Sequence, residues 1–206
     1  MSFKIMNARW TVVILVATLT ACFACAKKSY IDVSYQLPPA AGTLAGHTVF
    51  IETRDLRSDT AIFNARAKAD FKDFTGLFSL SVNTPGEQQR VVGAYALPKL
   101  FEAALKRRLE NLGVKIASQQ SADVPVFRIK INRFRINLIG QKWKTDISYE
   151  ASLARDSKLI ARETVTGNAE RLKLIGSGGA EKVLSGIFSQ MINRLNIERL
   201  FQEAKL

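Results

Sequence analysis

Apolar residues recur at intervals of three and four in two segments of the chain, and this spacing predicts two amphipathic helices. The first runs from Leu97 to Leu112, with Pro98 in its first turn and Gly113 directly after it, as is typical of helix ends. The second covers residues 180–195. Its apolar stripe consists of Ala180, Val183, Leu184, Ile187, Phe188, Met191, Ile192 and Leu195. Each helix should bury one face on the core.

Alternation of apolar and polar residues predicts a long strand over residues 126–138. Its apolar set moves by one position halfway along, from Phe127, Ile129 and Ile131 to Phe134, Ile136 and Leu138. Such a shift would turn half of these side chains to solvent, so we expect a β-bulge near Asn132 and Arg133.

Shorter alternating runs predict the remaining strands. These are residues 48–53, 114–117, 147–153 and 159–169, with a hairpin turn at 155–158. The order is therefore strand, helix, strand, three meandering strands and helix. It predicts an α+β fold: a two-layer sandwich of a mostly antiparallel sheet with both amphipathic helices on one face.

The segment from Ala61 to Gln89 lacks this periodicity and is predicted to be irregular. Its aromatic residues are numerous for a loop: Phe63, Phe71, Phe74 and Phe78. Two interpretations stay open. The segment packs on the core, or it forms a lid or a partner-binding flap, because long loops are uncommon unless they are functional.

The first residues have the order of a secretory signal. Lys4 and Arg9 form a positive start, an apolar run follows, and small residues lead to Cys22. The segment Leu19-Thr-Ala-Cys22 resembles the bacterial lipobox: an aliphatic residue, two small residues and cysteine. The resemblance implies cleavage before Cys22 and a diacylglycerol on its sulfur.

Three other interpretations of this segment are open. Cys25 as the lipid acceptor would place bulky Phe23 where a small residue is expected. An uncleaved anchor would rely on an apolar run at the lower edge of what spans roughly 30 Å of hydrocarbon. A redox pair of Cys22 and Cys25 would normally lie at a helix N-terminus inside a folded domain. We therefore favour lipidation of Cys22.

These features divide the chain into a signal peptide (1–21), a lipidated tether (22–46) and a single envelope domain (47–206). Pro38 and Pro39 lie in the tether, where residues 30–37 alternate as a short edge strand would. Position 23 is Phe, so the Asp that usually retains bacterial lipoproteins in the inner membrane is absent. The periplasmic side of the outer membrane is the expected location, ahead of the inner membrane.

Composition and charge narrow the partners. The 206 residues are 47% hydrophobic and 23% charged, which suits one globular domain, and the net charge is +12. A basic protein favours anionic partners, and in an exported one these are lipid headgroups or acidic cell-wall polymers rather than nucleic acid. Residues 26–206 contain no cysteine and one histidine, His47. We therefore predict no disulfide, no metal site and no cofactor in the domain.

Six basic residues of the long strand and the turn after it are predicted to share one polar face: Arg128, Lys130, Arg133, Arg135, Lys142 and Lys144. One interpretation is a surface for an anionic partner. The other is an ordinary solvated face whose charges prevent pairing with further strands. Trp143, between the two lysines, either enters a membrane interface or fills the core at a strand end.

No catalytic constellation is visible, so the chain is predicted not to be an enzyme. The G-x-S-x-G pattern of serine nucleophiles is missing, and no pair of carboxylates is placed to converge. The Gly-rich segment 176–179 precedes a helix, but the Lys-Ser/Thr pair of phosphate-binding loops does not follow it. A plain hinge is the better interpretation.

The mature chain resembles the small bacterial lipoproteins of the YajG type and, more distantly, the auxiliary lipoproteins of ABC-type transport systems. Besides the lipobox and the Pro-rich tether, the resemblance rests on Asp55-Leu-Arg57 after a strand, on Leu109-Glu-Asn-Leu-Gly113 at a helix end, and on Thr166-Gly167 before the last helix. It implies a non-enzymatic envelope protein whose sheet is covered by two helices. For the auxiliary lipoproteins of ABC-type transport systems, the resemblance implies a role in holding or bridging lipid-trafficking machinery.

Two functions are therefore expected. The first is an anchored accessory or scaffold protein that binds another envelope protein. The second is a lipid- or polymer-binding module that uses the basic sheet face.

Overall fold

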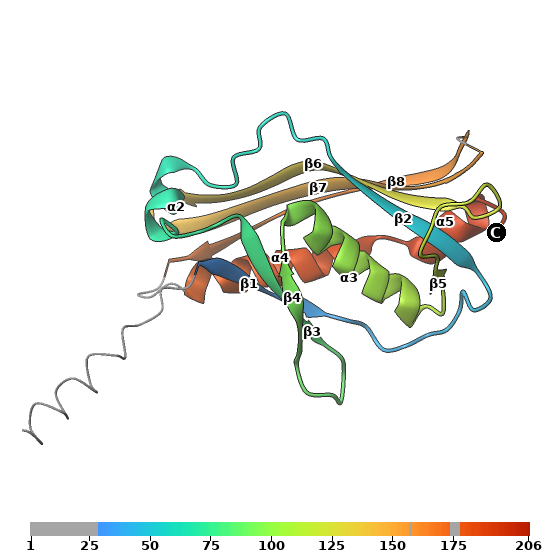
Figure 1. The fold of residues 1–206 in the computed structure, drawn as a ribbon. Coiled ribbons are helices and arrows are strands. Elements are labelled where there is room, and N and C mark those ends of the chain that lie inside the picture. Colours follow the sequence, from blue (N-terminus) through green and yellow to red (C-terminus); the bar gives the residue numbers. More distant parts are fainter. Residues whose placement is uncertain (1–28, 157, 174–177) are drawn as a thin grey trace, which may run out of the picture.

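A computed structural model of the chain describes residues 29–156, 158–173 and 178–206. These residues form an α+β fold with two sheets, as Figure 1 shows. The elements in chain order are β1 (Tyr30–Gln36), β2 (Thr48–Asp55), α2 (Ala65–Asp70), β3 (Leu77–Asn83), β4 (Arg90–Tyr95), α3 (Leu97–Asn111), β5 (Lys115–Ile116), β6 (Val126–Ile139), β7 (Lys142–Arg155), β8 (Lys158–Leu172), α4 (Gly178–Arg194) and α5 (Ile197–Glu203).

The larger sheet has the strand order β5-β2-β6-β7-β8. Strands β6, β7 and β8 form the predicted antiparallel meander, whereas β2 runs parallel to β5 and β6. The predicted bulge is confirmed, because the register of β6 against β7 shifts between Ile131 and Arg133. The shift returns Phe134 and Ile136 to the core side, where each is buried.

Helices α3 and α4 cover the same face of this sheet, as the apolar stripes predict. The ring of Phe101 in α3 makes edge contacts with Phe134 of β6, Tyr149 of β7 and Phe188 of α4, at centroid distances of 6.1, 5.4 and 5.2 Å. The Tyr149 hydroxyl also donates to the carbonyl of Met191 at 2.9 Å. The core therefore lies between the sheet and the two helices.

A second, three-stranded sheet (β1-β3-β4) was not predicted. The prediction that residues 61–89 are irregular is wrong, because they contain α2 and β3. Phe63 contacts the rings of Phe71 and Phe74 at 5.0 and 5.3 Å, and Phe74 contacts buried Phe78 at 5.3 Å. These contacts support the interpretation in which the segment packs on the core.

Strand β1 lies within the segment 22–46 that we assigned to the tether, yet it is part of the fold. It pairs in parallel with β3 on one side. On the other side, polar residues spaced by four along α4 satisfy its backbone: Glu181 accepts from the amide of Asp32 (3.0 Å), Ser185 from Ser34 (2.9 Å) and Ser189 from Gln36 (3.0 Å), and Asn193 donates to the Gln36 carbonyl (2.8 Å). An edge strand is thereby closed to further pairing.

Candidate functional site

The six predicted basic residues lie together on the face of the larger sheet that the helices do not cover, here named the outer face. Each of them is paired with a carboxylate. Arg128 pairs with Glu52 (2.7 Å), Lys130 with Glu150 (2.9 Å), Arg133 with Asp146 (3.0 Å), Arg135 with Asp59, and Lys142 and Lys144 both with Glu170 (2.8 and 3.3 Å). Six cations thus face five carboxylates.

The cations lower the pKa of two of these carboxylates, Glu52 and Glu170. The hydrogen bond from Arg128 lowers the pKa of Glu52, and the hydrogen bonds from Lys142 and Lys144 lower the pKa of Glu170. Because each of these six cations has a carboxylate partner within the chain, the six together contribute little net charge to attract an anionic partner. The six predicted residues do lie on one face. That they bind an anionic partner stays a prediction.

The Asp55-Leu-Arg57 segment closes the loop that follows β2. The Arg57 guanidinium donates to both carboxylate oxygens of Asp55, at 2.9 and 2.8 Å, and to the carbonyl of Thr60 at 3.1 Å. These bonds lower the pKa of Asp55, and the Arg57 side chain is only 6% exposed. Both charges are therefore used to shape the loop.

Gly167, in the Thr166-Gly167 motif of the resemblance, has a packing role. A Cβ at this position would overlap the end of the Met191 side chain, so glycine leaves room for that side chain between α4 and β8.

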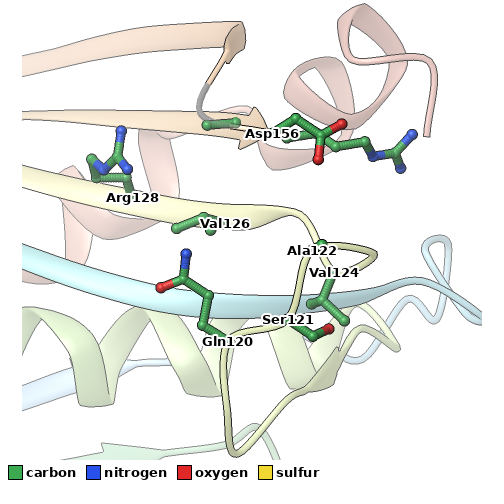
Figure 2. Close-up of a pocket in the computed structure, with 9 residues that line it drawn as sticks. Gln120, Ser121, Ala122, Val124, Val126, Arg128 and Asp156 are labelled. Atoms are coloured by element: carbon green, nitrogen blue, oxygen red, sulfur yellow. The ribbon is translucent and has the colours of Figure 1, made fainter.

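A cavity of about 480 Å³ opens at the end of the larger sheet where β6 begins and β7 turns into β8. Figure 2 shows Arg128 and Asp156 on opposite sides of it, with Gln120 and Ser121 on the connection that precedes β6. Its lining holds one carboxylate and no histidine, cysteine or lysine. The cavity lacks the paired acid and base that enzymatic sites use.

Other candidate positions fill the core. Trp143 is 2% exposed and contacts the ring of Phe71 at 5.6 Å, so the core interpretation of this residue is confirmed. His47 packs against the ring of Phe201 at 5.4 Å. Among residues 29–156, 158–173 and 178–206, no group of His, Cys, Asp and Glu could hold a metal ion. The described helices are all too short or too polar to cross a bilayer. Cys22 and the hinge residues 176 and 177 lie outside the described residues.

Sequence reasoning missed a second basic region, at the end of the molecule where the described chain begins. We name it the entry end and define it as residues 29–30, 64–77, 139–144 and 170–173. Several contacts join these segments: the Thr75 amide donates to the Ser29 carbonyl at 3.0 Å, the Lys173 amide donates to the Gln141 carbonyl at 2.7 Å, and the Lys173 ammonium pairs with Asp70. In Figure 1 this end carries α2 and the start of β1. Only the fold brings these distant segments together.

Comparisons with known proteins place the fold. No protein-family model and no curated protein matches the sequence. A protein of the DUF330 family from Xanthomonas campestris has 16% identity and a TM-score of 0.51, over 84% of this chain and 93% of that one. The rare lipoprotein B from Shewanella oneidensis has 15% identity and a TM-score of 0.41, over 51% and 88%. A minor lipoprotein from Acinetobacter baumannii has 15% identity and a TM-score of 0.37, over 52% and 88%.

At this identity the Xanthomonas protein shows that the fold is shared and says nothing of function. Structures of related shape thus include bacterial lipoproteins, but with TM-scores below 0.5 these two carry no further argument. The resemblance to YajG-type lipoproteins stays a prediction.

Proposed function

We propose that the chain is a membrane-anchored, non-enzymatic lipoprotein of the bacterial envelope that acts as an accessory or scaffold subunit of an envelope assembly or lipid-transport system. The observation that carries the proposal is the lipobox ending at Cys22, seven residues before Ser29, where the described fold begins. Acyl chains on Cys22 would hold the domain firmly, since each buried methylene contributes about 0.8 kcal/mol.

The described chemistry supports a binding role. The six predicted cations of the outer face and the charges of the Asp55–Arg57 loop form ion pairs within the chain, and the cavity beside β6 has no paired acid and base. A protein with these features contributes surfaces to an assembly rather than a reaction. The expected location is the periplasmic side of the outer membrane, and the expected partner is another envelope protein.

The alternative, a module that binds lipid or cell-wall polymer through the outer face, is less favoured. Each of its six cations already has a carboxylate within the chain. Replacing these carboxylates by an external anion would bring little net gain in binding free energy.

Metabolic labelling with palmitate tests the anchor. The wild-type chain and Cys25→Ala should incorporate label and fractionate with outer membranes, whereas Cys22→Ala should do neither. Label that depends on Cys25, or a Cys22→Ala chain that is still acylated, would contradict the assignment.

Affinity purification in mild detergent tests the accessory role. Enrichment of assembly or transport proteins with the wild-type chain, lost for Cys22→Ala, is the expected result. Recovery with only anionic lipid or wall fragments would favour the alternative.

A further inference from the structure

The entry end has unpaired positive charge, unlike the six predicted basic residues of the outer face. It contains seven Lys or Arg residues and three Asp or Glu residues, a net charge of +4. Lys142, Lys144 and Lys173 have carboxylate partners. The other four cations are exposed and form no ion pair with any described residue: Arg66, Lys68, Lys72 and Arg171. Their charge is available to an external partner.

Large apolar side chains are exposed at the same end. Ile139 is 53% exposed and Leu172 is 58% exposed, and both flank the β6–β7 turn. Tyr30 and Leu77, neighbours across β1 and β3, are 42% and 40% exposed. Apolar side chains beside unpaired cations are the composition of surfaces that lie in the headgroup region of a bilayer.

This end is rigidly built. Asn64 caps α2 by accepting from the Ala67 amide at 2.9 Å and is bonded to the backbone of Leu138. Beneath α2, the ring of Phe71 stacks on Phe63 at 5.0 Å and contacts buried Trp143. The exposed cations of α2 are therefore presented on a fixed surface rather than on a free loop.

The position of the lipobox supplies the geometric argument. Only seven residue steps separate Cys22 from Ser29, and Ser29 is bonded to Thr75 at the entry end. A fully extended chain of that length spans about 25 Å at most. A lipid on Cys22 would therefore hold this end, and not the opposite one, close to the bilayer.

We propose that the entry end docks on an anionic phospholipid leaflet, the same leaflet that holds the lipid of Cys22. The inference deepens the proposed function and, for the choice of leaflet, rests on it. Arg66, Lys68 and Lys72 meet headgroup phosphates, and Ile139 and Leu172 enter the interface between headgroups and acyl chains. The domain then stands on its entry end, and the cavity beside β6 points away from the membrane.

Vesicle flotation with the unlipidated chain from Ala26 to Leu206 tests the docking surface without the anchor. All described strands and helices lie within this chain. The probes are vesicles of phosphatidylcholine with 30 mol% phosphatidylglycerol, and pure phosphatidylcholine vesicles. The test variant is Arg66→Glu/Lys68→Glu/Lys72→Glu. Its matched control is Lys115→Glu/Lys158→Glu/Arg162→Glu, which changes charge equally at exposed residues outside the entry end.

We expect the wild-type chain to float with anionic vesicles and not with neutral ones. Each basic residue at an anionic surface contributes roughly fivefold to partitioning, so the charge-reversed test variant should lose at least about 100-fold. The control should lose far less. The milder Arg66→Gln/Lys68→Gln/Lys72→Gln variant removes the same three basic residues and should lose about 100-fold. This variant is compared with the wild-type chain if the triple Glu variant unfolds at a lower temperature.

Equal losses in the test variant and its control, or equal flotation with both kinds of vesicle, would overturn the docking surface. Neither result depends on acylation. Failure of palmitate labelling would instead remove the anchor and leave the flotation result standing, so the two proposals can fail separately.

Discussion

The outer face and the entry end are both rich in lysine and arginine, but the six predicted cations of the outer face have carboxylate partners, whereas four cations of the entry end have none among the described residues. On the outer face, Arg128 and Lys130 lie 2.7 and 2.9 Å from carboxylate oxygens. At the entry end, Arg66 and Lys68 are exposed and pair with no described carboxylate. The number of basic residues therefore does not locate a binding surface, because the positions of the carboxylates decide which cations are unpaired.

The difference has a topological cause. The partner of Arg128 is Glu52 on the neighbouring parallel strand, 76 residues earlier, and the partner of Lys130 is Glu150 on the antiparallel strand that follows. Cross-strand neighbours of opposite charge stabilise a sheet face. Helix α2 has no strand beside its exposed face, and its cations stay unpaired.

The largest expected effect concerns the base of the entry end. Trp143→Ala should lower the free energy of unfolding by about 3–5 kcal/mol, because it removes a buried aromatic side chain beneath α2. Ile139→Ser, a nearby exposed position, should change it by less than about 0.5 kcal/mol. Chemical denaturation followed by circular dichroism measures both. A loss below about 1 kcal/mol for Trp143→Ala would mean that the entry end is not rigidly supported.

A smaller effect should follow when the pairing at the boundary of the two regions is removed. Glu170 pairs with both Lys142 and Lys144, so Glu170→Gln leaves two more cations unpaired at the entry end. Partitioning to anionic vesicles should rise by about fivefold. Glu163→Gln, in the same strand but away from the entry end, is the control. An unchanged partition coefficient for Glu170→Gln would show that these lysines do not face the lipid.

Acid should weaken the ion pairs of the outer face and of the Asp55–Arg57 loop. Arg128 lowers the folded-state pKa of Glu52, and Arg57 lowers that of Asp55. A carboxyl with a lowered folded-state pKa stabilises the fold above its unfolded pKa, near 4, and this stability is lost as the pH falls further. The melting temperature should be level from pH 6 to 8 and should fall below about pH 4.5.

Glu52→Gln should reduce this acid-dependent loss and lower the stability at pH 7 by up to roughly 1 kcal/mol. Melting curves of the two chains between pH 3 and 8 measure the difference. Superimposable pH profiles would exclude Glu52 as a contributor.

The smallest effect is expected on the outer face itself. Arg133→Gln/Arg135→Gln removes two cations that already have partners, so partitioning to anionic vesicles should change by less than about twofold. A loss as large as that of the Arg66→Gln/Lys68→Gln/Lys72→Gln variant would restore the outer face as the lipid-binding surface.

The pattern of apolar and polar residues within single segments was enough to predict much of the fold. It predicted both long helices, the meander and the bulge between Ile131 and Arg133, because each depends on neighbours along one segment. It missed the smaller sheet, because the apolar run of β3 is short and β1 pairs with it in parallel from a region 47 residues earlier. The polar stripe of α4 that closes β1 was visible only as ordinary surface residues.

The candidate site was predicted in part for the same reason. The sequence placed the six basic residues on one face, but their carboxylate partners come from other strands and from the loop at Asp59. The entry end joins four separate segments through contacts such as Lys173 with Asp70 and Thr75 with Ser29. No periodicity in one segment could reveal it.

Orientation at the membrane tests the central claim most directly. Residues 26–206 lack cysteine, so Ile139→Cys and Leu159→Cys, both 53% exposed, can each carry one environment-sensitive fluorophore. The chain is held on anionic vesicles by an N-terminal histidine tag and a nickel-chelating lipid. We predict a blue shift, and quenching by nitroxide lipids, for the label at position 139 and neither change for the label at 159. Equal signals at both positions, or a signal at 159 alone, would contradict a domain that stands on its entry end.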